Sequence, residues 1–157
     1  MKLSLLCIGK LSSSWLQEGA SDYSQRISRY LPLNIDELKE CKLGKKGDSR
    51  KIIRQEGEQL LARVPQDAYT VALDEKGKLF TSEDFAGFFS RHMLNGTPEL
   101  AFVIGGPYGL DSAVKEKANL EMSLTPMTIT HQLARLILLE QIYRGMTILR
   151  NEPYHNR

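Results

Sequence analysis

Two kinds of segment alternate along the chain. Short apolar or alternating runs are typical of strands, and apolar residues that recur every three or four positions are typical of one helix face. The expected strands are residues 3–8, 33–39, 69–73, 99–104 and 121–129, the last continuing as an extended loop around Pro126. The expected helices lie between Ser12–Ser14 and Pro32, at about 50–63, from Thr81 to Asn95, near 111–118 and at about 131–150.

Local signals support these boundaries. Asp48 or Ser49 is a suitable N-cap for the second helix, and the segment 81–84 (TSED) carries capping chemistry for the third. Residues 74–78 (DEKGK) are expected to form a turn after the third strand.

Strands that alternate with helices, and that are apolar on both faces, predict an α/β fold. The expected architecture is a three-layer sandwich with a mostly parallel sheet, formed by one domain over residues 1–157. No run of 18 apolar residues occurs, so no membrane span is expected. The N-terminal MKLSLLCIGK reads as a first strand because its apolar part is too short for a signal peptide.

The last helix differs from the others because its apolar residues point in nearly every direction. A helix that is apolar all round is buried on all sides. In a chain of 157 residues this indicates either a subunit interface or a central core helix.

Charge narrows the range of partners. Hydrophobic residues make up 41% and charged residues 25% of the chain, and the net charge is +2, which excludes a strongly basic architectural nucleic-acid binder. Basic residues still gather after the second strand, where they attract phosphate or simply form a solvated surface; the candidate RNA-binding residues are Lys42, Lys45, Lys46 and Arg50, followed by Lys51 and Arg54. Cys7 and Cys41 form neither a zinc set nor a disulfide framework, so a reduced cytoplasmic protein is expected.

The segment 102–110 (FVIGGPYGL) places glycines directly after a strand. Its spacing differs from the dinucleotide-binding and P-loop patterns, and Pro107 lacks an N–H that a phosphate would need. A tight turn and another kind of ligand site both remain open.

Ligands of open α/β sheets bind outside the carboxyl ends of the strands. Three such ends are recognisable, at Leu73–Asp74, at Gly105–Gly106 and over 123–129 (SLTPMTI). Together they could enclose a flat, uncharged ring such as adenine and bind its edges through backbone groups.

These segments resemble a known family. FVIGGPYG, the run SLTPMTITHQLARLILLEQIYR and the ending NEPYH are similar to the RlmH family of SPOUT-class methyltransferases, and the resemblance covers essentially the whole chain. It implies a C-terminal trefoil knot, which the general absence of knots would not suggest. It also implies a homodimer through the C-terminal helix and methylation of N3 of a pseudouridine in large-subunit ribosomal RNA, with the assembled ribosome or the large subunit as substrate. The implied cofactor is S-adenosylmethionine, at Leu73, Gly105, Ser123, Leu124, Thr125, Pro126, Met127, Thr128 and Ile129.

The chain departs from the family pattern at two places. Thr130 stands where the family commonly has proline before His131, but threonine is a competent N-cap. Asn156 follows His155, so the terminal cation is displaced to Arg157.

The N3 proton of a pseudouridine needs an acceptor, or its anion needs stabilisation. Tyr154, His155 and Arg144 are the candidate catalytic residues, without a choice of proton acceptor. Plainer interpretations remain: Glu140 and Arg144 form an intrahelical ion pair, His131 anchors the helix start, and the tail is a frayed end. A non-catalytic ribosome-binding factor and a small nucleotide-binding enzyme without an RNA substrate are the rival functions.

Overall fold

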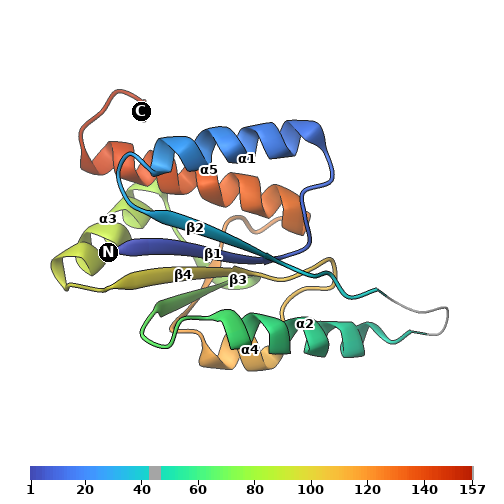
Figure 1. The fold of residues 1–157 in the computed structure, drawn as a ribbon. Helices are drawn as coiled ribbons and strands as arrows, with labels where there is room; N and C mark the ends of the chain where they lie inside the picture. The colour runs from blue at the N-terminus through green and yellow to red at the C-terminus, as the bar shows by residue number, and fades with distance from the viewer. Residues whose placement is uncertain (43–46, 157) are drawn as a thin grey trace.

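The structure is a computed structural model that describes residues 1–42 and 47–156. Strands and helices alternate along the chain, as the hydrophobic pattern predicts (Figure 1). The strands are β1 (Lys2–Ile8), β2 (Leu33–Leu38), β3 (Tyr69–Leu79), β4 (Glu99–Ile104) and β5 (Leu120–Ser123). The helices are α1 (Ser14–Ile27), α2 (Ser49–Arg63), α3 (Ser82–Leu94), α4 (Ser112–Lys117) and α5 (His131–Leu149).

The strands form one sheet in the order β2-β1-β4-β3-β5, and every pairing between them is parallel. The carboxyl ends of all five strands therefore meet at one edge. The order is not sequential, so this edge gathers loops that lie far apart in the chain.

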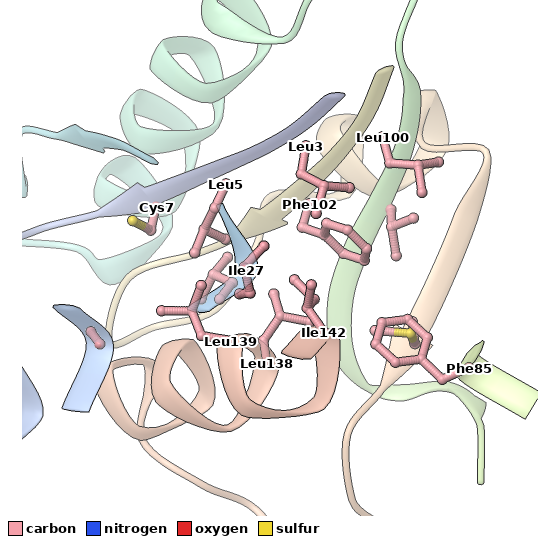
Figure 2. Close-up of a cluster of buried hydrophobic side chains, with 14 of the residues drawn as sticks. Leu3, Leu5, Cys7, Ile27, Phe85, Leu100, Phe102, Leu138, Leu139 and Ile142 are labelled. Carbon is pink, nitrogen blue, oxygen red and sulfur yellow. The ribbon is translucent and has the colours of Figure 1, made fainter. Parts of the chain in front are cut away.

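Helices cover both faces of the sheet, which confirms the predicted three-layer α/β sandwich (Figure 1). The larger core lies under α1, α3 and α5, where Leu3 and Phe102 of the sheet face Leu138 and Ile142 of α5 (Figure 2). The second core lies under α2 and α4 and contains Leu6, Val103, Leu60 and Val114, among others. The knot that the family resemblance implies concerns how the chain is threaded, and it stays a prediction.

Capping side chains begin α2, α3 and α5 where the sequence indicates. Asp48 accepts a hydrogen bond from the Arg50 N–H at 2.9 Å, Thr81 accepts from Asp84 at 3.0 Å, and Thr130 accepts from Leu133 at 3.2 Å. Each bond satisfies one of the free N–H groups of a first helical turn. Thr130 is therefore a working N-cap in the place of the family's proline.

The expected turn over 74–78 is wrong in one respect, because β3 continues to Leu79. Leu73 and Lys78 both pair with Met122 of β5, so the residues between them form a bulge within the strand. A Cβ on Gly77 would lie 2.6 Å from the backbone of Met122. Only glycine lets the bulged strand approach β5 this closely.

Helix α5 packs on the sheet and contacts both α1 and α3. Its buried face includes Leu138, Leu139, Ile142 and Met146, so it is a core helix. Apolar residues on its other faces remain half-exposed: Leu133, Leu136, Ile137, Tyr143 and Ile148. Within the residues that the structure describes, no helix is long and apolar enough to cross a membrane.

Candidate functional site

A cleft of about 810 Å³ opens at the carboxyl edge of the sheet. Its walls come from the bulge of β3, the turn after β4, the loop between β5 and α5, and the start of α1. The volume lies in the range of small-molecule sites. All three predicted strand ends thus meet around one cavity.

The segment GGPYG forms a tight turn in one wall of the cleft. The Gly109 N–H donates to the Gly106 carbonyl at 3.0 Å, and the two residues form an antiparallel bridge. Gly109 has φ +93°, which glycine adopts without strain. A Cβ on Gly105 would lie 2.6 Å from the Gly109 carbonyl oxygen, so the turn itself already requires glycine at 105. Close approach of a ligand is not needed to explain this glycine.

The bulge of β3 forms the second wall and carries charge. Asp74 accepts from the Lys76 N–H at 2.9 Å and pairs with the Lys115 ammonium at 3.1 Å. Burial by itself raises the pKa of Asp74, but these two partners outweigh it and hold the pKa below its usual value. Asp74 belongs to one of the three predicted strand ends, whereas Glu75, expected in a simple turn, and Lys115 were not predicted as cleft residues.

The loop between β5 and α5 forms the third wall and is folded on itself. The Ser123 hydroxyl donates to the Thr125 carbonyl at 2.8 Å, and the Thr125 hydroxyl accepts from the Met127 N–H at 3.1 Å. The Thr128 hydroxyl donates to Glu75 at 2.8 Å and so ties the loop to the bulge. Of the nine predicted cofactor residues, eight line the cleft, namely Leu73, Gly105, Ser123, Leu124, Thr125, Met127, Thr128 and Ile129. Pro126 is exposed and does not.

The start of α5 closes the cleft towards α1. The side-chain oxygen of Gln132 accepts from the N–H and the hydroxyl of Ser12, at 2.9 and 3.0 Å. His131 also lines the cleft; burial lowers its pKa, and its buried Nε2 has no hydrogen-bond partner among the described residues. Ser12 and Ser13, used above only to mark the start of the first helix, also line the cleft, because the same rule about carboxyl ends applies to β1.

Arg135 lies behind this wall and is 2% exposed. Its NH1 pairs with Glu37 of β2 at 2.6 Å, and its NH2 donates to the Gly9 carbonyl at 2.8 Å. Arg135 therefore fastens α5 to the ends of β1 and β2.

The C-terminal tail packs on the other end of α5. The Tyr154 hydroxyl donates to Glu140 at 3.0 Å and lies 3.1 Å from the Tyr23 hydroxyl, while the Arg144 guanidinium sits 4.8 Å from the centre of the Tyr154 ring. Burial and these hydrogen bonds raise the pKa of Tyr154. Arg144 also forms the expected intrahelical ion pair with Glu140. A tail held by these contacts is not a frayed end.

His155 lies between Arg144 and Glu83 of α3. Its Nδ1 is 3.4 Å from the Arg144 NH1, and its Nε2 is 3.3 Å from a Glu83 carboxylate oxygen. Arginine only donates, so Nδ1 accepts and Nε2–H donates to Glu83. In this arrangement the Nε2 of His155 carries a proton.

The three candidate catalytic residues are together, but they are not at the cleft of the same chain. The cleft includes Ala134 at the start of α5, whereas Arg144 follows by roughly three helical turns, or about 15 Å along the axis. Tyr154 and His155 pack beside Arg144 and are not among the cleft residues.

Only part of the predicted basic patch can be placed. Lys42 and Arg50 are exposed, and Arg50 pairs with Asp48 at 3.0 Å, which reduces its availability to phosphate. Lys45 and Lys46 lie outside the described residues. Over 1–42 and 47–156, no group of three or more His, Cys, Asp or Glu side chains is arranged to hold a metal ion.

Comparison with known proteins places the chain in a class. A family model described as "Predicted SPOUT methyltransferase" matches residues 1–155, and the chain belongs to this family of methyltransferases. The fold agrees with that of a tRNA (m1G37) methyltransferase from Aquifex aeolicus, with a TM-score of 0.58 at 11% identity, over 100% of this chain and 76% of the other. A probable methylase family protein from Haemophilus influenzae Rd KW20 gives a TM-score of 0.55 at 12% identity, over 99% and 70% of the two chains.

Within the family, the most informative relatives carry one name. The chain is 55% identical over its full length to the ribosomal RNA large subunit methyltransferase H of Syntrophotalea carbinolica, and both proteins are covered completely. It is 48% identical to the protein of the same name from Trichlorobacter lovleyi, over 99% of this chain and 100% of the other. The resemblance recognised in GGPYG, SLTPMTI and the YH tail is thereby confirmed.

Proposed function

We propose that the protein transfers a methyl group from S-adenosylmethionine to N3 of a pseudouridine in large-subunit ribosomal RNA. The observation that carries the proposal is the cleft, because its walls are the segments that the family resemblance assigns to the cofactor. The names of the full-length relatives support the RNA substrate. Such a reaction takes place in the cytoplasm, where ribosomes are.

The cleft suits this cofactor. Much of its wall is backbone and uncharged side chain from the glycine turn and the β5–α5 loop, which suits the flat adenine ring. The Nε2 of His131, which has no partner within 1–42 and 47–156, and the carboxylates of Asp74 and Glu75 supply polar groups at the same cavity. We propose that the trefoil knot secures the β5–α5 loop in this position.

When bound, S-adenosylmethionine supplies an electrophilic methyl carbon. The protein must hold the target nitrogen in line with it, which is chiefly a positioning task. The raised pKa of Tyr154 keeps its hydroxyl protonated, so Tyr154 serves as a donor or stacking group. The imidazole of His155 is the proposed acceptor of the N3 proton, with the Arg144 cation beside it.

These groups reach a cleft only if a second chain contributes them. We propose that the half-exposed apolar faces of α5 form a homodimer, in which the tail of one chain completes the cleft of its partner. The separation of about three helical turns within one chain supports this arrangement. A monomer would bind the cofactor and fail to methylate.

RNA contact is then shared between the cleft and the basic segment that begins at Lys42. Such a small surface is poorly suited to naked RNA, so the assembled ribosome or its large subunit is the proposed substrate. Exchanging Lys42, Lys45 and Lys46 for glutamine should weaken ribosome binding and reduce its dependence on salt.

The experiment is methylation of ribosomes from a strain that lacks the gene. Labelled S-adenosylmethionine and purified protein are added to whole ribosomes, to large subunits and to extracted RNA, and the product is mapped by mass spectrometry. The proposal expects one modified pseudouridine on assembled particles. Cofactor binding without methyl transfer, or ribosome binding without cofactor binding, would instead favour a non-catalytic ribosome-binding factor.

A further inference from the structure

The glycines of the turn after β4 are required for three different reasons. Gly109 has a positive φ, and Gly105 is crowded by the backbone of the turn. Gly106 has neither feature. A Cβ on Gly106 would lie 2.6 Å from Oε2 of Glu56, and the three nearest atoms to it all belong to the Glu56 carboxyl group.

Glu56 lies on α2 and packs against the glycine turn without lining the cleft. It is 1% exposed, although it carries an ionisable side chain. Its Oε1 accepts a hydrogen bond from the Cys41 N–H at 3.0 Å. Its Oε2, which faces Gly106, has no hydrogen-bond partner among the described residues.

The position of Glu56 in the sequence is also unusual. Ile52, Glu56 and Leu60 follow one another at four-residue spacing, and all three are buried. The carboxyl group thus interrupts the apolar face of an amphipathic helix. Burying a polar group is costly unless it is hydrogen-bonded, so a carboxyl group that is only partly hydrogen-bonded at a core position calls for an explanation.

We propose that Glu56 is a positioning residue for the cofactor cleft. It supports the glycine turn and links this turn to Cys41, the residue that precedes the basic segment. One carboxyl group touches both regions: its Oε1 holds the backbone of Cys41, and its Oε2 packs against Gly106 in the cleft wall. The inference rests on the proposed function, because it assumes that S-adenosylmethionine occupies this cleft.

The neutral form of the Glu56 carboxyl group suits this role. Burial raises its pKa, the hydrogen bond from Cys41 lowers it, and the charge of Glu40 raises it further. Asp111, which contacts the same turn of α2 at Gly57, and the Cys41 thiol bring no positive charge. The bracing is therefore strongest at low pH and weakens as the pH rises through the raised pKa, because only Oε1 of an ionised carboxylate has a hydrogen-bond donor among the described residues.

The first test measures S-adenosylmethionine affinity by calorimetry in four forms of the protein. Glu56→Gln keeps the shape and the acceptor for Cys41, so it should bind as the wild type does at neutral pH. Glu56→Ala removes the brace and should bind about tenfold more weakly. Leu60→Ala lies one turn further along the same buried face; it should lower thermal stability at least as much and leave affinity within about twofold.

The second test uses the contact itself. Gly106→Ala should weaken binding because its Cβ meets the Glu56 carboxyl group. In the double variant Gly106→Ala/Glu56→Ala, the space left by the carboxyl group accepts this Cβ, so affinity should exceed that of Gly106→Ala alone. Groups in contact give such non-additive effects, whereas independent sites do not.

Affinities measured over a series of pH values distinguish bracing, which depends on the protonation of Glu56, from simple packing, which does not. The ratio of wild-type to Glu56→Gln affinity cancels the titration of His131 and of the cofactor, and it should fall as the pH rises. The inference is overturned if Glu56→Ala binds like Leu60→Ala, if Glu56→Gln loses as much affinity as Glu56→Ala, if the two substitutions are additive, or if the ratio is flat. A wild-type protein that binds no S-adenosylmethionine refutes the proposed function instead.

Discussion

The two ends of α5 have different surroundings. The first turn joins the cleft wall and is fastened by a cap, a buried arginine and a link to α1. The last turns carry Arg144 and hold a tail of tyrosine and histidine through contacts that are partly open to solvent. A cofactor site benefits from rigid walls, whereas a group that meets a large substrate has to be accessible. One helix can thus separate cofactor binding from the handling of the substrate proton.

The largest expected effect is on turnover, and it tests whether the two ends of α5 have separate functions. His155→Ala should lower turnover on ribosomes by about a hundredfold or more, the usual worth of a general base. Affinity for S-adenosylmethionine should not change, because His155 does not line the cleft of its own chain and is proposed to meet the RNA base and not the cofactor in the partner's cleft. Turnover is measured by incorporation of labelled methyl groups, and affinity by calorimetry.

Asn156→Ala is the matched control, since it changes the next residue of the same tail. It should turn over at the wild-type rate. Equal turnover in His155→Ala and Asn156→Ala would show that the tail has no part in the chemistry.

The next effect concerns stability at the cleft end. Arg135→Leu removes a buried cation that holds Glu37 and the Gly9 carbonyl. Loss of one partner of a buried pair costs several kcal/mol; because Glu37 is partly exposed, we expect about 2–3 kcal/mol in the free energy of unfolding. Urea denaturation measures the change.

Arg63→Leu provides the comparison, because the Arg63 side chain in its pair with Asp36 is exposed whereas that of Arg135 is buried. It should cost less than about 1 kcal/mol. If the two variants are equally stable, the Arg135 pair does not fasten α5.

A smaller effect comes from the helix caps. Thr130→Ala and Thr81→Ala each remove one capping hydrogen bond and should each cost about 1 kcal/mol in the free energy of unfolding. Only Thr130 lines the cleft, so only Thr130→Ala should also weaken cofactor binding. Equal affinities in both variants would mean that the start of α5 need not be fixed for binding.

The smallest effect is the pH dependence of the Asp74–Lys115 pair. The folded pKa of Asp74 is lowered, so its contribution is present above the unfolded pKa and is lost as the pH falls through the folded one. The stability difference between wild type and Asp74→Asn should be below about 1 kcal/mol at pH 6 and should shrink towards pH 3. Urea denaturation across this range checks it, and the trend should weaken in Lys115→Gln.

Much of the fold followed from local patterns. The strands and helices appear where hydrophobic periodicity placed them, and Asp48, Thr81 and Thr130 cap the helices they precede. Such features depend on neighbouring residues and so can be recognised in a single sequence. The bulge in β3 could not, because it depends on the pairing of Leu73 and Lys78 with the same residue of β5.

The sequence predicted three walls of the candidate site, but not all of the residues that line it. The rule about strand ends located three walls of the cleft, but it was not applied to β1, and Ser12 and Ser13 were overlooked as part of the wall. Glu56 could have been recognised from the sequence, because it places a carboxylate on the apolar face of α2. Nothing in the sequence indicates that Glu56 lies against Gly106.

The sequence by itself determined the alternating elements, the helix caps and the family, because these features depend on local periodicity and on short motifs. The tertiary structure decided which residues meet. The sheet order β2-β1-β4-β3-β5 brings the ends of distant segments to one edge, where Glu56 meets Gly106 and Thr128 meets Glu75. The length of α5 keeps the tail away from the cleft of its own chain. Both outcomes follow from how rigid elements pack, which no single segment encodes.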